Sequence, residues 1–146
     1  MDELDTKIIE LLQVDGRASN AGIARKVGVS EGTVRRRLKR LVQDEFIQVV
    51  ALPDPAKLGY HSEALIGLQV DPNRVDEVAE GLSDLREVNW VAITAGRYDI
   101  FAWATLPSSE ALGVFLKTKV GTIKGVQRSE TFINLSSKKR GYGVTV

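Results

Sequence analysis

The stretch SNAGIARKVGVSEGTVRRRLKRLV, residues 19–42, predicts two short helices joined by a tight turn. Ser19 is placed to cap the first helix, and Gly28 can end it in the left-handed conformation. Ser30 can then cap a second helix that continues to about Gln43, because its side-chain oxygen can accept a hydrogen bond from a nearby backbone amide. A short helix, a glycine turn and a second, longer helix form the pattern of a helix-turn-helix.

The second helix combines an apolar stripe with a basic surface. Val34, Leu38 and Leu41 have the spacing of one helix face. Residues 17–42 carry eight basic side chains and one acidic one, a balance of +7, whereas the whole chain of 146 residues carries +1. A concentrated positive patch of this kind is typical of proteins that bind polyanions. Most charge runs are solvated faces, but this one coincides with capping residues, a glycine turn and an apolar stripe.

These coinciding features favour binding of double-stranded DNA, with the second helix in the major groove. Ser30 begins the predicted DNA-binding set. The side chains expected to lie closest to the bases follow it along the helix: Glu31, Gly32, Thr33, Arg35 and Arg36. Three further cations are expected to reach phosphates: Arg37, Lys39 and Arg40.

The composition excludes several other classes of protein. With 43% hydrophobic and 27% charged residues, the chain is expected to be globular. It has no cysteine and a single histidine, which leaves no disulfide, no thiolate nucleophile and no histidine-rich zinc site. No nucleotide-binding loop or nucleophile–base pair stands out, so we expect no catalytic residues, no metal and no cofactor. There is neither a membrane-length apolar run nor a signal-peptide layout, and we expect a cytoplasmic protein.

The rest of the N-terminal region fits one small helical domain. Residues 2–14 read as an amphipathic helix that would cover the apolar sides of the other two, which predicts a three-helix domain over residues 1–45. Residues 46–52 are rich in β-prone side chains and predict a short strand. Pro53 and Pro55 stop that strand, so residues 46–60 are interpreted as a strand and linker between two domains.

The remaining residues, 61–146, follow a different rhythm. Strand-like segments are expected at 61–70, 87–95, 100–106 and 126–136, and helices at 72–84 and 108–120. The order β-α-β-β-α-β predicts a ferredoxin-like sandwich, which makes the whole chain an α+β protein. The strands at 87–95 and 100–106 are apolar on both faces, although the helices can cover only one. A second copy of the chain is the simplest cover for the other face, and we expect a homodimer.

Several motifs in this order resemble the Lrp/AsnC family of transcriptional regulators. They are LDTKIIELLQVDGR at residues 4–17, IARKVGVSEGTVRRRLKRL at 23–41, FIQ at 46–48, LPDPAKLG at 52–59, GRYD at 96–99 and GVQRSET at 125–131. The resemblance implies a sequence-specific DNA-binding regulator that responds to a small effector, usually an amino acid, and whose dimers assemble into octamers or larger rings. It also implies an effector site between dimers, with Gly96, Tyr98 and Asp99 on a turn and Ser129 and Thr131 on the last strand.

Two points remain open at the level of sequence. The GRYD segment could be only a hairpin turn, in which case the protein would be an architectural DNA binder without an effector. The family commonly has glycine just before the apolar pair that follows the third helix, whereas this chain has Glu45. A left-handed backbone at this position would strain Glu45 by about 1 kcal/mol or more.

If Asp99 faces the effector, its carboxylate is the natural partner of an amino-acid ammonium.

Overall fold

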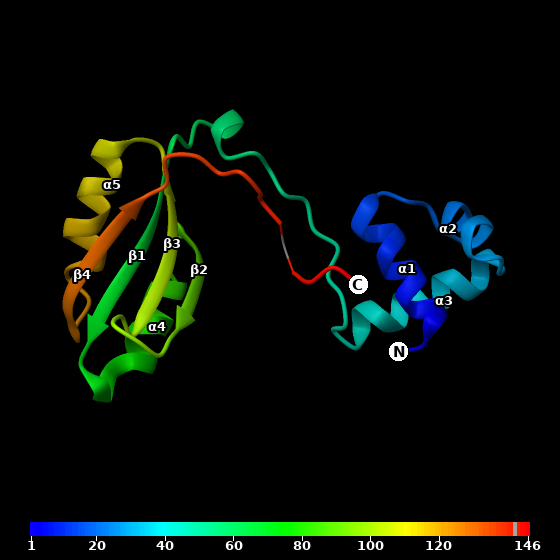
Figure 1. Cartoon of the computed structure of the whole chain (residues 1–146), viewed down its shortest axis with the longest axis horizontal. Helices are drawn as coiled ribbons and strands as arrows, with labels where there is room; N and C mark the ends of the chain where they lie inside the picture. The colour runs from blue at the N-terminus through cyan, green and yellow to red at the C-terminus, as the bar shows by residue number, and fades with distance from the viewer. Residues whose placement is uncertain (142) are drawn as a thin grey trace. The chain divides into compact units, whose positions relative to one another are not determined.

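The computed structural model describes residues 1–141 and 143–146, which fall into two compact units (Figure 1). The first unit comprises Met1–Leu52 together with Arg140–Val146, and the second comprises Pro53–Lys139. The described residues of the C-terminal tail therefore group with the helical unit, whereas the predicted domain 61–146 included them with the sheet. In the described part of this tail, the side-chain amide of Gln13 donates to the carbonyl of Val144 at 2.6 Å and accepts from the amide of Val146 at 3.3 Å.

The first unit is the predicted three-helix domain, with α1 at Glu3–Val14, α2 at Asn20–Val27 and α3 at Glu31–Gln43. Ser19 and Ser30 cap α2 and α3, accepting from the amides of Gly22 and Thr33, and Gly28 ends α2 with a φ of 73°. Each of these positions was predicted. Apolar side chains from all three helices close the core: Ile8, Ile9, Ile23, Ala24, Val34 and Leu41.

The end of α3 has the left-handed residue that the sequence raised as a possibility. Glu45 has a φ of 58°, and among the described residues it is the one non-glycine residue with a positive φ. The amide of Phe46 donates to the carbonyl of Leu41 at 2.9 Å, and the amide of Glu45 donates to that of Val42 at 3.2 Å. These two bonds define a Schellman motif, in which glycine is the favoured residue at the position that Glu45 occupies.

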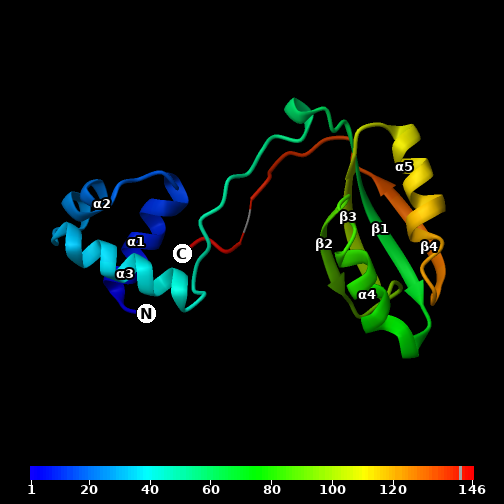
Figure 2. The ribbon, with the colours of Figure 1, turned by 180° about the vertical axis from the view of Figure 1, so that it is seen from behind.

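The second unit is a four-stranded antiparallel sheet with two helices on one face (Figures 1 and 2). Its strands are β1 at Ser62–Val70, β2 at Val88–Ile93, β3 at Ile100–Leu106 and β4 at Val126–Ile133, in the order β2-β3-β1-β4. Helix α4 is Val75–Ser83, which follows a 3-10 turn at Pro72–Arg74, and α5 is Ser109–Phe115, which continues as a π-helical turn at Leu116–Val120. This is the predicted β-α-β-β-α-β order, and the α+β fold class is confirmed.

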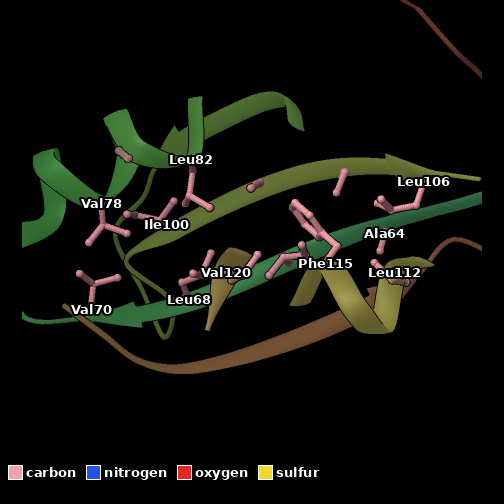
Figure 3. Close-up of a cluster of buried hydrophobic side chains, with 14 residues drawn as sticks. Ala64, Leu68, Val70, Val78, Leu82, Ile100, Leu106, Leu112, Phe115 and Val120 are labelled. Atoms are coloured by element: carbon pink, nitrogen blue, oxygen red, sulfur yellow. The ribbon is translucent and has the colours of Figure 1, made fainter. Parts of the chain in front are cut away.

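The core of the second unit lies between the sheet and its helices (Figure 3). Alternate residues of the two central strands point into it, which is the period of two that a sheet with one covered face requires. They meet Val78 and Leu82 of α4 and Leu112 and Phe115 of α5. The opposite, open face is apolar but exposed: Trp90 is 51% exposed and Phe132 is 43% exposed.

Residues 46–52 do not form the predicted strand. They have no regular secondary structure, and Phe46, Val49, Val50 and Leu52 are all more than half exposed. A strand needs a neighbour to pair with its backbone groups, and β-propensity alone does not supply one. A short 3-10 helix at Ala56–Leu58 follows, before β1 begins. Across the described residues, no helix is long and apolar enough to span a membrane.

Candidate DNA interface and effector pocket

Helix α3 exposes a face of unpaired cations. Gly32, Arg36 and Lys39 are exposed and lie on the side opposite the buried Val34 and Leu41. Among the described residues, Arg36 and Lys39 have neither an ion pair nor a side-chain hydrogen bond, so both can reach a ligand without breaking a contact. The two side chains are three residues apart and therefore share one face of the helix.

The first turn of α3 is ordered by its own side chains. Ser30 Oγ accepts from the amide of Thr33 at 3.2 Å and shares a hydrogen bond of 2.9 Å with the Thr33 hydroxyl. Arg35 donates to Glu31 at 3.0 Å, one turn earlier, and both side chains are at least half exposed. These contacts organise the end of the helix that would approach the bases.

Two of the predicted phosphate contacts have partners inside the protein. Arg37 donates to Asp2 and, at 3.2 Å, to Asp5, while Arg40 donates to Asp5 at 2.7 Å. Asp5 is completely buried, and Asp2 and Asp5 also form the capping box of α1. The prediction placed both arginines on DNA; in the structure their guanidinium groups attach α3 to the start of α1.

This cluster shifts the pKa of its outer members. The pKa of Asp2 is lowered, first by the hydrogen bond from the Asp5 amide and then by Arg37, and the pKa of Arg37 is raised, chiefly by its hydrogen bond to Asp2. Both shifts favour the charged forms, so the pair is ionised at neutral pH.

In the second unit, the turn at residues 96–99 is held tightly to the sheet. Gly96 has a φ of 140°, which side chains disfavour. The Tyr98 ring lies directly over Gly67 of β1, where an added Cβ would come within 2.8 Å of the ring. Edge-on contacts with Phe101 and Phe132, at centroid distances of 5.4 and 6.3 Å, complete the packing of this ring.

Asp99 has a structural partner. Its Oδ2 accepts from the amide of Val70 at 2.8 Å, and its backbone amide donates to the carbonyl of Leu68 at 2.8 Å. Asp99 therefore closes the end of β1 against the turn. The prediction had it bind an effector ammonium, but the carboxylate is not among the groups that line the neighbouring pocket.

That pocket has a volume of about 270 Å³ and carries charges of both signs. Arg128 and Glu130 of β4 pair with Gln69 and Gly67 of β1, so all four lie on the open face of the sheet. The wall is completed by residues from the turn and the strand edge: Arg97, Tyr98 and Ser129. The side chain of Gln69 donates to the carbonyl of Arg97 at 3.1 Å and joins the turn to the strand.

The structure brings together some of the predicted effector residues and separates others. Tyr98 and the backbone position of Ser129 lie at the pocket, and Gly96 belongs to the same turn. Ser129 pairs with Leu68, which is completely buried under the helices, so its side chain points to the opposite face of the sheet from Tyr98. Thr131 pairs with Ile66, which is completely buried under the helices, so Thr131 points to the opposite face of the sheet from Tyr98. The prediction gave Ser129 and Thr131 to the effector pocket; alternation along β4 places Arg128 and Glu130 on the face that carries Tyr98.

The predicted effector set also lacked five residues: Gly67, Gln69, Arg97, Arg128 and Glu130. For Arg128 and Glu130 a signal was present, because charged residues two apart on a strand share one face. Gly67 carried a weaker signal as an isolated glycine inside a strand, which marks a close approach of another group.

Comparison with known proteins agrees with this organisation. Residues 1–42 match the AsnC-type helix-turn-helix domain, and residues 63–144 match the Lrp/AsnC ligand binding domain. An uncharacterised HTH-type transcriptional regulator of Pyrococcus furiosus is 46% identical over 143 residues, covering 97% of each chain. The regulator Ptr1 of Methanocaldococcus jannaschii is 35% identical, covering 97% of this chain and 96% of its own.

Solved structures show the same likeness. AsnC of E. coli superposes with a TM-score of 0.89 at 30% identity, covering 97% of both chains. The regulator NMB0573 of Neisseria meningitidis, solved as a complex with L-Met, has a TM-score of 0.89 at 24% identity, covering 96% of this chain and 93% of its own. These relatives are transcriptional regulators and not enzymes. With both of its units matched in order, the chain belongs to the Lrp/AsnC family of transcriptional regulators.

Proposed function

We propose that this chain is a sequence-specific DNA-binding regulator that acts in the cytoplasm and reads the major groove with α3. The exposed face formed by Arg36 and Lys39, which no other described side chain engages, carries the proposal. Arg35 and the capped first turn, with Ser30, Glu31, Gly32 and Thr33, lie at the end of α3 that would meet base edges.

Two substitutions in α3 test this placement. Arg36→Ala is expected to weaken operator binding by about 1–3 kcal/mol if the guanidinium pairs with guanine. Lys39→Ala is expected to weaken all sequences alike and to lower the slope of log K against log salt concentration by about one unit. Gel shifts on operator and scrambled duplexes separate the two effects. Normal operator binding by both variants would contradict the placement.

We further propose that the pocket beside the turn at residues 96–99, in the second unit, binds a free amino acid. A zwitterion needs a cation for its carboxylate and an anion for its ammonium, and the pocket offers Arg128 and Arg97 beside Glu130. The Neisseria relative solved with L-Met supports an amino acid as the ligand class. Glu130 is a better candidate for the ammonium than Asp99, whose carboxylate already accepts from the Val70 amide.

Calorimetry against the twenty amino acids tests the pocket. Glu130→Gln is expected to weaken the effector roughly ten- to a hundredfold, because a hydrogen bond to a charged group contributes about 1.5–3 kcal/mol. Glu110→Gln, on the exposed surface of α5, is the matched control. Asp99→Ala is expected to lower the stability of the second unit, because the Asp99 carboxylate accepts from the Val70 amide. Unchanged effector affinity in Glu130→Gln would place the ligand elsewhere.

The open face of the sheet supports a homodimer. Trp90 and Phe132 expose large apolar surfaces there, and a second copy would bury them. By family resemblance, dimers would assemble further, into octamers or larger. Light scattering on the wild type and on Trp90→Glu tests this, and an unchanged mass in the variant would refute the use of this face.

An architectural DNA binder without an effector remains the second candidate. The same α3 face would serve it, and Asp99 would then be only a structural residue of the turn. It predicts that none of the twenty amino acids binds or alters the DNA footprint.

A further inference from the structure

The start of α1 holds an unusual charged group. Among the described residues, Asp5 is the one ionisable side chain that is completely buried. It lies on a helix with no predicted DNA contact, yet both of its carboxylate oxygens accept from α3: Oδ1 from Arg37 at 3.2 Å and Oδ2 from Arg40 at 2.7 Å. Asp2, one turn earlier in the chain, adds a second carboxylate against Arg37.

The two arginines belong to one flank of α3. They are three residues apart and therefore neighbours on the helix surface, at the side of the Arg36 and Lys39 face. Arg37 is 23% exposed and Arg40 is 48% exposed. Taking either guanidinium to a DNA phosphate would leave the Asp5 carboxylate, which water does not reach, with one cation instead of two, which is unfavourable.

We propose that Asp2 and Asp5 act as an internal counter-ion that withholds Arg37 and Arg40 from DNA, and so set the balance between sequence-specific and nonspecific binding. Nonspecific affinity depends on the number of phosphates that a protein neutralises. Base contacts made by other residues of α3 do not depend on that number. Two fewer phosphate contacts therefore lower nonspecific affinity more than they lower the discrimination between sequences.

The proposal predicts that removal of an acid on α1 strengthens nonspecific binding by releasing arginines of α3. In full-length Asp5→Asn, the salt slope measured by fluorescence anisotropy on a scrambled duplex is expected to steepen by about 0.9 for each arginine released. Nonspecific affinity at low salt is expected to rise several-fold, and the ratio of operator to scrambled affinity to fall. Asp2→Asn, at a half-exposed site, is expected to give the same change at smaller size and with little loss of folding.

Glu10→Gln is the matched control. It removes the same unit of charge from the exposed surface of α1 without touching an arginine of α3, so its salt slope is expected to equal that of the wild type. An equal steepening in Glu10→Gln and Asp5→Asn would show an effect of net charge alone and would overturn the proposal.

The converse test removes the cations. Arg37→Gln leaves Arg40 on Asp5 and is expected to keep the wild-type slope, whereas Lys39→Gln is expected to lower it by about 0.9. A lowered salt slope in Arg37→Gln, or an unchanged salt slope in both Asp2→Asn and Asp5→Asn, would refute the proposal that the two acids withhold these arginines from DNA. The proposal rests on α3 being the DNA-binding helix: an unchanged slope in Lys39→Gln would overturn that placement and the counter-ion together. Circular dichroism on each variant establishes that it is folded.

Discussion

Replacement of Glu45 by glycine should stabilise the helical unit. Glu45 occupies the left-handed position of the Schellman motif that ends α3, with a φ of 58°. The two hydrogen bonds of that motif use only backbone groups, the amides of Glu45 and Phe46, and a glycine can make both of them. Glu45→Gly therefore removes strain without removing a hydrogen bond.

The magnitude follows from three terms, two of which favour the substitution and one of which opposes it. A left-handed backbone costs an ordinary residue about 1–2 kcal/mol. Glycine loses more conformational freedom on folding, which lowers the gain in stability by about 0.5–1 kcal/mol. A carboxylate at the C-terminus of a helix is also unfavourable, by about 0.3–1 kcal/mol, and its removal adds to the gain. We expect a net stabilisation of about 1 kcal/mol, which for a unit of this size raises Tm by roughly 4–8 °C.

The two units can be followed separately in the intact chain. Both tryptophans, Trp90 and Trp103, belong to unit 2, so their fluorescence reports the unfolding of the sheet. Hydrogen exchange at the amides of α1 and α3 reports the helical unit. Glu45→Gly is expected to slow exchange in those helices and to leave the fluorescence transition unchanged.

A second substitution separates strain from charge. Glu45→Gln removes the carboxylate but keeps the Cβ, so it should recover only the smaller, electrostatic part of the gain. Stability of Glu45→Gly equal to or below that of Glu45→Gln would refute the argument from backbone strain.

Three further outcomes follow from the structure. Gly67→Ala should destabilise unit 2 by about 1–3 kcal/mol and displace the Tyr98 ring, because its Cβ would lie 2.8 Å from that ring; tryptophan fluorescence during urea unfolding measures the loss. The pKa of Glu87 is lowered below its ordinary value of 4.5, chiefly by the hydrogen bond from Lys119. Its contribution to stability is therefore present above about pH 4.5 and lost as the pH falls through the lowered pKa, so Tm values of wild type and Glu87→Gln should converge in acid. Ser30→Ala should cost the helical unit about 1 kcal/mol, since it removes the cap of α3; circular dichroism checks it.

Local signals explain why so much of the fold could be predicted. Ser19, Gly28 and Ser30 act on backbone groups within four residues of themselves, so their roles do not depend on the rest of the chain. The strand β3 was predicted at its observed bounds, Ile100–Leu106, because apolar residues on both faces bounded by a turn and a proline leave little freedom.

Signals that need a distant partner were harder to interpret. Residues 46–52 have the composition of a strand, but no segment within residues 1–141 or 143–146 pairs with them. The pocket proposed for the effector depends on register: a shift of one residue along β4 would exchange Arg128 and Glu130 for Ser129 and Thr131. Sequence predicted the strand but could not fix which of its faces joins the turn that carries Tyr98.

Charge counting shows the same limit in the DNA-binding region. The balance of +7 over residues 17–42 treats every arginine as available, yet Arg37 and Arg40 are matched by carboxylates that lie outside that window. Asp5 is 32 residues from Arg37 in the chain, and only the packing of α1 against α3 brings them together. A window along the sequence measures how many cations are near each other in the chain. Under the proposed placement of α3, binding to the DNA backbone depends instead on the cations that the fold leaves unpaired, and on α3 these are Arg36 and Lys39.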